Sequence, residues 1–346
     1  MSEEVINKLF NTINTNYVFI YTPPKVGSTT LVSSLRISLG NSFNVIHIHD
    51  DIMLNVLTGI NNVTVNEIID YISKKGNNVY IIDVYRTPIE RKMSEFFEKI
   101  SPYHFNNSEE NINKYSINRV SDRFNKLFPH LAIGEHYFDK YNIESPIPFN
   151  FETKYTIQEI NNIKYIKLRL HDSKIWSKIL STIFQREIIL INDYQTNDKI
   201  IAKLYKKFKN EYQIPLNYFE LIKNCKYFNF YFSEEERKQY LQNWEKRIID
   251  NFIPYTNEEY KFYVNLYLEN QYINDIQIEH YIDNGCLCIA CTKARQEIII
   301  KAKNGETNFN KIIHQESVNK DILTRINKIK SISKNIKQNN RFKIKY

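Results

Sequence analysis

Short apolar runs alternate with stretches of helical period over the first 100 residues of this 346-residue chain. Their spacing predicts strands at 17–22, 44–49 and 79–85 and helices at 29–39, 64–75 and 88–100. Strands separated by helices favour right-handed crossovers, and therefore an α/β fold with a mostly parallel sheet flanked by helices. Ligands of such sheets bind beyond the carboxyl ends of the strands, where Lys25, His49 and Arg86 all fall.

The pattern is less regular after residue 100. Residues 101–155 are rich in Asn, Tyr, Phe and Pro, and we expect irregular structure there, typical of a functional loop. Farther along, the pattern predicts strands near 163–170 and 187–191 and helices near 173–184, 197–211 and 234–251. After Pro254 it changes to a Tyr-rich helical stretch, a hairpin near 286–303 and a basic tail. The chain thus divides into a domain over 1–255, with 101–155 as a candidate acceptor-binding insertion, and a C-terminal α+β appendage over 256–346.

The segment that follows the first strand carries a candidate phosphate site. It reads Thr-Pro-Pro-Lys-Val-Gly-Ser-Thr-Thr over 22–30 and leads directly into a helix. Backbone N–H groups and the positive end of a helix dipole meet at such a turn. The candidate site comprises Lys25, Val26, Gly27, Ser28, Thr29 and Thr30. Lys25 adds positive charge, Gly27 lets the backbone approach a ligand closely, and the three hydroxyl residues can donate hydrogen bonds. The loop is not a Walker A motif, because its lysine precedes the glycine.

A second motif follows the strand at 79–85. Arg86 comes directly after this strand, Pro88 suits the first turn of a helix, and Ser94 lies about two helical turns farther on. A phosphate dianion favours a planar bidentate donor together with a hydroxyl group. Arg86 and Ser94 are therefore a second candidate phosphate site.

These two motifs resemble those of the sulfotransferases that use 3′-phosphoadenosine 5′-phosphosulfate (PAPS). The order Pro-Lys-x-Gly-Ser/Thr-Thr is similar to their 5′-phosphosulfate loop, and Arg-x-Pro-x-x-Arg-x-x-Ser is similar to their 3′-phosphate site. Looser likenesses at 163–172, at 229–236 and at Trp244 extend over roughly residues 15–250 to bacterial sulfotransferase-like capsular polysaccharide synthesis proteins. The resemblance implies a P-loop-like sulfotransferase fold, PAPS as the cofactor, and transfer of a sulfuryl group to a hydroxyl-bearing acceptor, a glycan.

The predicted strand at 44–49 offers a catalytic base. Alternation along this strand places Val45, His47 and His49 on one face, with His49 at its carboxyl end. Histidine titrates near neutral pH and suits proton abstraction from a hydroxyl. Several sulfotransferases carry His-x-His here, and the resemblance implies His49 as the base and His47 as its orienting partner. It also gives Lys25 the task of stabilising charge on the leaving phosphate.

Other interpretations stay open from the sequence. Both histidines could simply pack or cap the next helix at Asp50, and other family branches use a glutamate, so Glu135 or His136 are further candidates for the base. Asp83 ends an apolar run as a Walker B acid does, which would fit a nucleotide-dependent phosphotransferase of the kinase type. A sulfotransferase-like binding protein without turnover is the third alternative.

The chain offers no convincing metal site. Asp50 and Asp51 are adjacent, not spaced as a metal-binding pair. A Cys-x-Cys-x-x-Cys motif is formed by Cys286, Cys288 and Cys291, and zinc would need a fourth ligand from afar, such as His280 or Cys225. Buried apolar cysteines explain the motif more simply, and we expect no metal.

The net charge of +8 is concentrated at the C-terminus. Residues 320–346 hold nine Lys or Arg and one acid, which accounts for the whole charge, so the rest is near neutral and no nucleic-acid surface is expected. Isoleucines recur at helical spacing in this tail, which either packs on the protein or makes peripheral membrane contact. No apolar run approaches the roughly 20 residues of a transmembrane segment, the start is unlike a signal peptide, and we expect a cytoplasmic protein.

Overall fold

The computed structural model describes residues 15–51, 53–54, 63–105, 107–128, 141, 143, 145–191, 200–257 and 260. These fall into two compact units, which we describe separately. The first unit holds the described residues up to Tyr85 and those between 141 and 191, and the second holds the others. The predicted insertion at 101–155 is thus shared between the units. Most of the predicted appendage lies outside the described residues, and the division at 255/256 stays a prediction.

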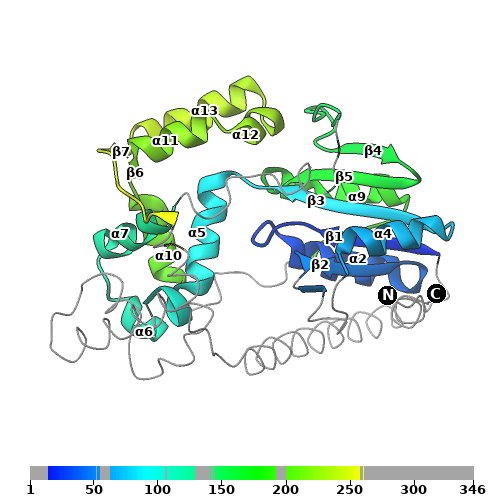
Figure 1. Ribbon diagram of the computed structural model, residues 1–346, viewed down its shortest axis with the longest axis horizontal. Coiled ribbons are helices and arrows are strands. Elements are labelled where there is room, and N and C mark those ends of the chain that lie inside the picture. Colours follow the sequence, from blue (N-terminus) through cyan, green and yellow to red (C-terminus); the bar gives the residue numbers. More distant parts are fainter. Residues whose placement is uncertain are drawn as a thin grey trace, which may run out of the picture. The chain divides into compact units, whose positions relative to one another are not determined.

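The first unit is built on a five-stranded sheet in the order β2-β1-β3-β5-β4 (Figure 1). Neighbours among the first four strands are parallel, and β4 runs antiparallel to β5. The mixed α/β architecture with a mostly parallel sheet is therefore confirmed. The bounds of the strands are Asn16–Tyr21 for β1, Asn44–Ile48 for β2, Asn78–Tyr85 for β3, Thr156–Ile160 for β4 and Ile163–Arg169 for β5.

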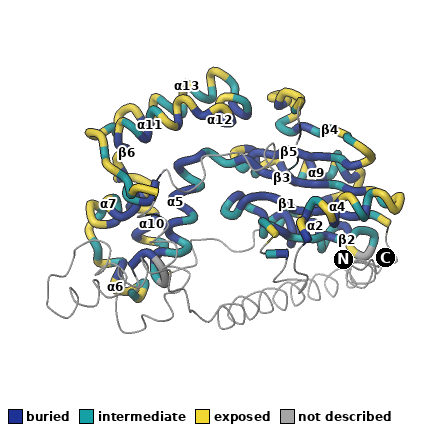
Figure 2. Tube along the Cα trace, viewed as in Figure 1, coloured by how far each residue is buried: buried dark blue, intermediate teal, exposed yellow. Residues whose placement is uncertain are grey.

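Helices cover both faces of this sheet. They are α2 (Ser28–Leu39), α4 (Val65–Lys74) and α9 (Trp176–Phe184), with short 3-10 turns η1 (Gly40–Ser42) and η3 (Leu170–Ile175). Val18 and Ile20 of β1 pack with α2 and α9, whereas Phe19 of β1 packs with α4. Because both faces are covered, β1 is buried almost throughout, as expected for a parallel sheet (Figure 2).

Residues 187–191, predicted as a strand, form none. Their backbone instead bonds to serine side chains of two helices. Ile189 N–H donates to Ser38 Oγ of α2 at 2.9 Å, and Ile188 N–H donates to Ser181 Oγ of α9 at the same distance. The apolar pattern correctly indicated burial, since Ile188 is fully buried. The backbone N–H groups of this segment, however, find their partners in serine hydroxyls and not in a neighbouring strand.

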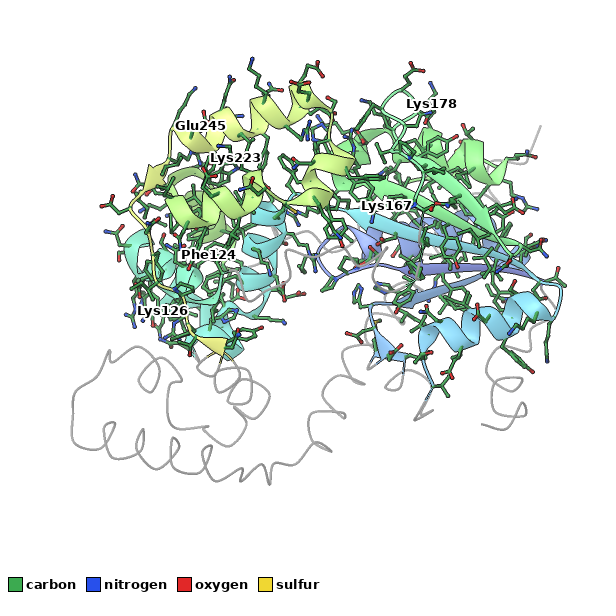
Figure 3. All side chains as sticks on the ribbon, turned by 45° about the horizontal axis from the view of Figure 1, so that its top comes forward. Phe124, Lys126, Lys167, Lys178, Lys223 and Glu245 are labelled. Atoms are coloured by element: carbon green, nitrogen blue, oxygen red, sulfur yellow. The ribbon has the colours of Figure 1, made fainter. Side chains whose placement is uncertain are left out.

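The second unit is mainly helical around an aromatic core (Figure 1). Phe97, Phe208 and Tyr212 lie in this core with Phe124, which Figure 3 labels. The helices are α5 (Pro88–Lys99), the π-helical turn η2 (Ile100–Phe105), α6 (Glu109–Ile112), α7 (Ile117–Leu127), α10 (Ala202–Glu211), α11 (Leu216–Lys223), α12 (Lys226–Tyr231) and α13 (Glu234–Glu245). Two short parallel strands, β6 (Ile214–Pro215) and β7 (Ile248–Ile249), pair with each other.

Two sequence expectations about this unit are wrong. Irregular structure was expected over 101–155, but α7 forms there because Ser116 caps it and Val120, Phe124 and Leu127 make one buried stripe. The helix predicted over 234–251 ends at Glu245, because the chain then turns so that β7 can pair with β6.

Among the residues that the structure describes, no helix has the length and apolar character that crossing a membrane requires. The surface of the second unit instead carries charged residues such as Lys223 and Glu245, which Figure 3 shows. The sequence expectation of no transmembrane segment agrees with this finding for that part of the chain.

A buried ion pair joins β3 to β5 inside the first unit. Lys167 Nζ lies 2.6 Å from Asp83 Oδ2, and the two side chains are 2% and 0% exposed. Asp83 and Lys167 are direct partners in the parallel register. The second carboxylate oxygen accepts the N–H of Val84 at 2.8 Å. The two opposite charges are paired inside the sheet, so replacing one residue would leave the other as a buried charge without its counter-ion.

We therefore expect Asp83→Leu or Lys167→Met alone to lower the free energy of unfolding by about 3–5 kcal/mol. The double variant should lose much less, because no single charge is then left behind. Urea unfolding of the single and double variants tests this. Lys223→Met is a matched control, since its pair with Glu220 is about half exposed and should contribute roughly 0–1 kcal/mol. Additive losses in the double variant would contradict the expectation.

Candidate functional site

The loop between β1 and α2 bends at two residues with left-handed backbone. Lys25 has a φ of 67° and Gly27 a φ of 86°. Between them Val26 is fully buried in the cluster that α2 and α9 share, so it anchors the loop. Lys25 is half-buried. A left-handed backbone at a residue with a side chain costs on the order of 1–3 kcal/mol, and such residues cluster at ligand sites.

Gly27 has a packing reason as well as a conformational one. A Cβ atom at this position would lie 3.0 Å from Leu170 Cδ1 and 3.0 Å from the Trp176 ring. The loop therefore runs directly against the η3 turn and the start of α9, and any larger residue would push it away. This close approach fixes where the first turn of α2 begins.

The N-terminus of α2 has features that suit an anion. Helix α2 starts at Ser28, no side chain caps it at Gly27, and its first turn contains no acidic residue. Ser28 is buried, and Thr29 and Thr30 are half-buried. The positive end of the helix dipole is thus not offset locally, and three hydroxyl residues follow one another there. The predicted set Lys25–Thr30 is brought together as one loop and helix start.

Thr22 links this loop to both neighbouring strands. Its N–H donates to the carbonyl of Ile48 at the end of β2, at 3.3 Å. On the other side its hydroxyl accepts the N–H of Val84 in β3 at 3.0 Å. Thr22 is fully buried. The role of Thr22 could not be predicted from the sequence, because a threonine before Pro-Pro carries no signal of its own.

His47 lies in β2 and His49 directly follows it, and their side chains are on the same side of the chain, as alternation predicted. Their rings meet edge to face with centroids 4.6 Å apart, and both residues are half-buried. His49 Nδ1 lies 2.6 Å from the carbonyl oxygen of Thr22. A carbonyl can only accept, so Nδ1 carries the proton and, in the neutral ring, Nε2 is the basic nitrogen. His49 therefore has the tautomer of a base that acts through Nε2.

Asp50 and Asp51 have structural partners. Asp50 Oδ1 accepts the N–H of Met53 at 2.7 Å, and Asp51 Oδ1 accepts that of Val65, the first residue of α4, at 2.8 Å. Both acids thus accept backbone N–H groups of the segment that follows β2. Burial, and next the carboxylates of Asp51 and Asp50, raise the pKa of Tyr21 above the ordinary range. Tyr21 stays a neutral phenol and is not a candidate base.

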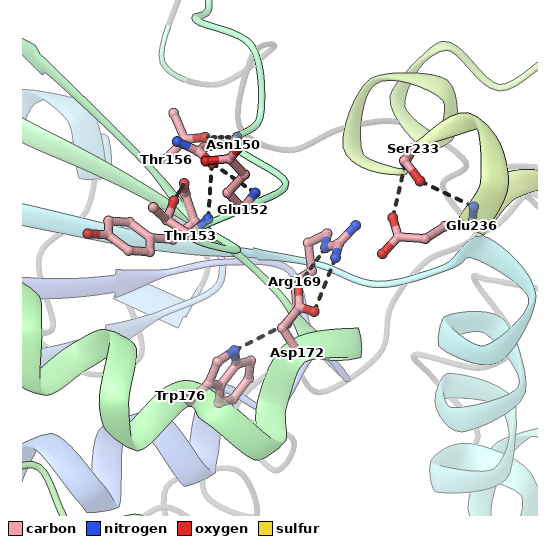
Figure 4. A network of polar contacts seen from close by, with 10 residues as sticks. Asn150, Glu152, Thr153, Thr156, Arg169, Asp172, Trp176, Ser233 and Glu236 are labelled. Atoms are coloured by element: carbon pink, nitrogen blue, oxygen red, sulfur yellow. Dashed lines mark hydrogen bonds and ion pairs between the residues drawn. The ribbon is translucent and has the colours of Figure 1, made fainter.

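Arg169 is a buried cation at the carboxyl end of β5 that the sequence did not single out. Its Nε and Nη2 donate to Asp172 Oδ2 and Oδ1 at 2.6 and 3.1 Å (Figure 4). Its guanidinium also lies over the ring of Phe149, 4.8 Å from the centroid, and its carbonyl accepts from Trp176 Nε1. Arg169 thus braces the η3 turn on which Gly27 packs. The only feature of the sequence that could have indicated this role is the polar turn that follows β5.

Arg86 and Ser94 belong to the second unit, whereas the Lys25 loop belongs to the first. Chain continuity alone places the backbone of Arg86 near the end of β3. Arg86 is the second residue after Val84, so the Cα atoms of these two residues lie within about 8 Å of each other. Arg86 is half-buried, and Ser94 is buried on α5, which begins with Pro88 after Thr87. The role of Arg86 and Ser94 as one phosphate site stays a prediction.

Lys92, two residues before Ser94, is not suited to hold an anion. Its side chain is 1% exposed, and burial lowers its pKa well below the ordinary value for lysine. Burial therefore disfavours the charged ammonium form, which is the form that would attract a phosphate. Of these two cations near the start of α5, the half-buried Arg86 is the better phosphate ligand.

The remaining candidates are a metal site and an alternative base. Within the described part of the chain, no three His, Cys, Asp or Glu side chains gather into a group that could hold a metal ion. Cys225 is buried. Glu135, His136 and His280 lie outside the described residues, as do Cys286, Cys288 and Cys291.

The first unit therefore brings together the Lys25–Thr30 loop, Thr22, His47 and His49 at the carboxyl ends of β1 and β2. The chain matches no protein-family model, no curated protein and no solved structure. The function of the site is therefore inferred from its residues and geometry.

Gly27→Ala should destabilise the protein more than the same change at Gly76. Both glycines have a similar positive φ, 86° and 82°, but an added Cβ at Gly76 meets nothing within 4 Å. Gly76→Ala should cost about 1–2 kcal/mol for the backbone alone. Gly27→Ala should cost about 1–3 kcal/mol more, for the clash with Trp176 and Leu170. Thermal or urea unfolding measures the difference, and equal losses would refute the close packing of the loop.

Proposed function

We propose that this chain is a PAPS-dependent sulfotransferase with a P-loop-like fold, which transfers a sulfuryl group to a hydroxyl of a carbohydrate. The observation that carries the proposal is the β1–α2 loop: a half-buried lysine, a left-handed glycine and an uncapped helix start at one point. The strand order gives independent support. From β1 the chain goes first to β2 on one side and then to β3 on the other, and ligands of open sheets bind where the order reverses.

The residues present fit the charges of the cofactor. The amides and hydroxyls of Ser28, Thr29 and Thr30, with the Lys25 ammonium, match the 5′-phosphosulfate group. Arg86 and Ser94 would hold the 3′-phosphate as a bidentate cation and a hydroxyl donor. When bound, the cofactor supplies the sulfuryl group and a phosphate leaving group.

The roles of the chain's residues follow from these positions. His49 Nε2 would take the proton of the acceptor hydroxyl as the acceptor oxygen bonds to sulfur. Lys25 would offer positive charge to the bridging oxygen as its bond to sulfur breaks. His47, in edge-to-face contact with His49, would help to orient the imidazole. The products are a sulfated acceptor and 3′-phosphoadenosine 5′-phosphate.

The phosphotransferase alternative is weakened by the place of Asp83. The acid that would hold Mg²⁺ in a kinase-like site is 0% exposed and paired with Lys167 at 2.6 Å. A carboxylate neutralised in this way is a poor ligand for a divalent cation. The binding-protein alternative differs from our proposal only in lacking turnover.

Ligand-dependent stabilisation separates these functions. 3′-Phosphoadenosine 5′-phosphate should raise the melting temperature, because a ligand at a concentration of 100 times its Kd adds about 2.7 kcal/mol to the free energy of unfolding. ATP with Mg²⁺ should not raise it. Transfer of labelled sulfate from PAPS to a glycan panel then tests turnover. Stabilisation by ATP and not by the PAPS product would refute the proposal, and binding without transfer would favour the binding protein.

Arg86→Ala should weaken binding of 3′-phosphoadenosine 5′-phosphate by roughly 10- to 100-fold, because charge-assisted hydrogen bonds are worth about 1.5–3 kcal/mol. Binding of adenosine 5′-phosphate, which lacks the 3′-phosphate, should stay nearly the same. Calorimetry with both ligands makes the comparison, and Lys99→Ala, which removes a cation at the other end of α5, is the control. If Arg86→Ala affects both ligands equally, Arg86 does not hold the 3′-phosphate.

His49→Asn should lower the transfer rate by about 10²–10⁴ while leaving cofactor affinity intact. The asparagine amide can still donate to the carbonyl of Thr22, so the fold keeps this hydrogen bond while the basic nitrogen is lost. Single-turnover transfer and calorimetry report the two effects separately. A variant that turns over like the wild type would exclude His49 and direct attention to Glu135 or His136.

A further inference from the structure

Thr22 has a side chain whose role the phosphate loop does not explain. The ladder between β1 and β3 ends at the pair Ile20 and Ile82, because Pro23 follows and the chain turns away. Beyond this point the Thr22 hydroxyl accepts the N–H of Val84 at 3.0 Å, as a strand carbonyl otherwise would. A fully buried side chain thus extends the sheet past the end of the strand.

The same residue holds His49 through its backbone. The Thr22 carbonyl lies 2.6 Å from His49 Nδ1, and the Thr22 N–H donates to the carbonyl of Ile48, the residue before His49. The peptide groups on both sides of Thr22 therefore bond to the end of β2 and to the histidine that follows it, while the Thr22 hydroxyl bonds to β3. A shift of Thr22 relative to β3 would move the carbonyl that selects the protonated nitrogen of His49.

We infer that Thr22 is a positioning residue for His49. Its hydroxyl, fixed to β3 at Val84, holds the carbonyl that keeps the imidazole in the Nδ1–H tautomer and directs Nε2 away from this bond. The catalytic consequence rests on the proposed function, but the hydrogen bond and the tautomer do not. The second residue after Val84 is Arg86, so Thr22 also connects the base to the strand end that precedes the predicted 3′-phosphate ligand.

A purely structural role for the hydroxyl makes a different prediction. If Thr22 only satisfied the buried N–H of Val84, its removal would lower stability but would leave the tautomer and the rate of chemistry unchanged. Val84 N–H also donates to Asp83 Oδ1 at 2.8 Å, so the loss of the hydroxyl would not leave this donor without a partner. Thr22→Val keeps the shape of the side chain and removes only the hydroxyl, which suits a test on the folded protein.

Nitrogen-15 NMR of the imidazoles tests the tautomer directly. The signal of His49 is identified by its loss in His49→Asn. The wild type should show His49 with a protonated Nδ1 and an unprotonated Nε2, and Thr22→Val should show a mixture of both tautomers. Thr22→Ser, which keeps the hydroxyl, should restore the wild-type spectrum. A protonated Nε2 in the wild-type neutral ring would overturn the inference without any variant.

The kinetic measurement separates positioning from binding. Thr22→Val should lower kcat by about 10- to 100-fold, as for a misplaced catalytic group, with little change in the KM for PAPS. Thr22→Ser should recover most of this loss. An unchanged tautomer and kcat in folded Thr22→Val would overturn the inference. If the wild type transfers no sulfate but Thr22→Val still mixes the tautomers, the proposed function fails and the positioning role stands.

Discussion

Strand β1 lies between β2 and β3 and must leave the sheet where both of its edges are paired. Backbone groups at such a place are buried, and each needs a partner. Thr22 meets this constraint with its N–H on β2 and its hydroxyl on β3. Beyond Thr22 the chain turns through the left-handed residues Lys25 and Gly27, and α2 then begins without a side-chain cap.

The charged residues near the carboxyl ends of the strands divide into two groups. Asp83 with Lys167 and Arg169 with Asp172 are buried, short ion pairs that neutralise each other and stabilise the sheet and the η3 turn. Lys25 and His49 are half-buried at the β1 and β2 ends of the sheet. The candidate catalytic residues thus lie on the β1–β2 side, while the two buried ion pairs on β3, β5 and the η3 turn are structural.

Several features could be predicted from local sequence. The strand, loop and helix around Lys25 follow from an apolar run, Pro-Pro, glycine and an apolar helical period, and the shared face of His47 and His49 follows from strand alternation. Long-range partners could not be predicted. The strand expected at 187–191 is replaced by serine contacts from α2 and α9, and helix α7 lies within a segment whose composition favoured loops.

The sequence by itself determined the α/β class, the position of the candidate phosphate loop and the chemical types of its residues, because these depend on neighbours a few positions apart. Only the tertiary structure decided that Asp83 is neutralised by Lys167, that Gly27 is required by Trp176, and that His49 carries its proton on Nδ1. Each of these depends on a contact between residues that are distant in the chain. Such contacts exist only after the sheet has set the register of its strands.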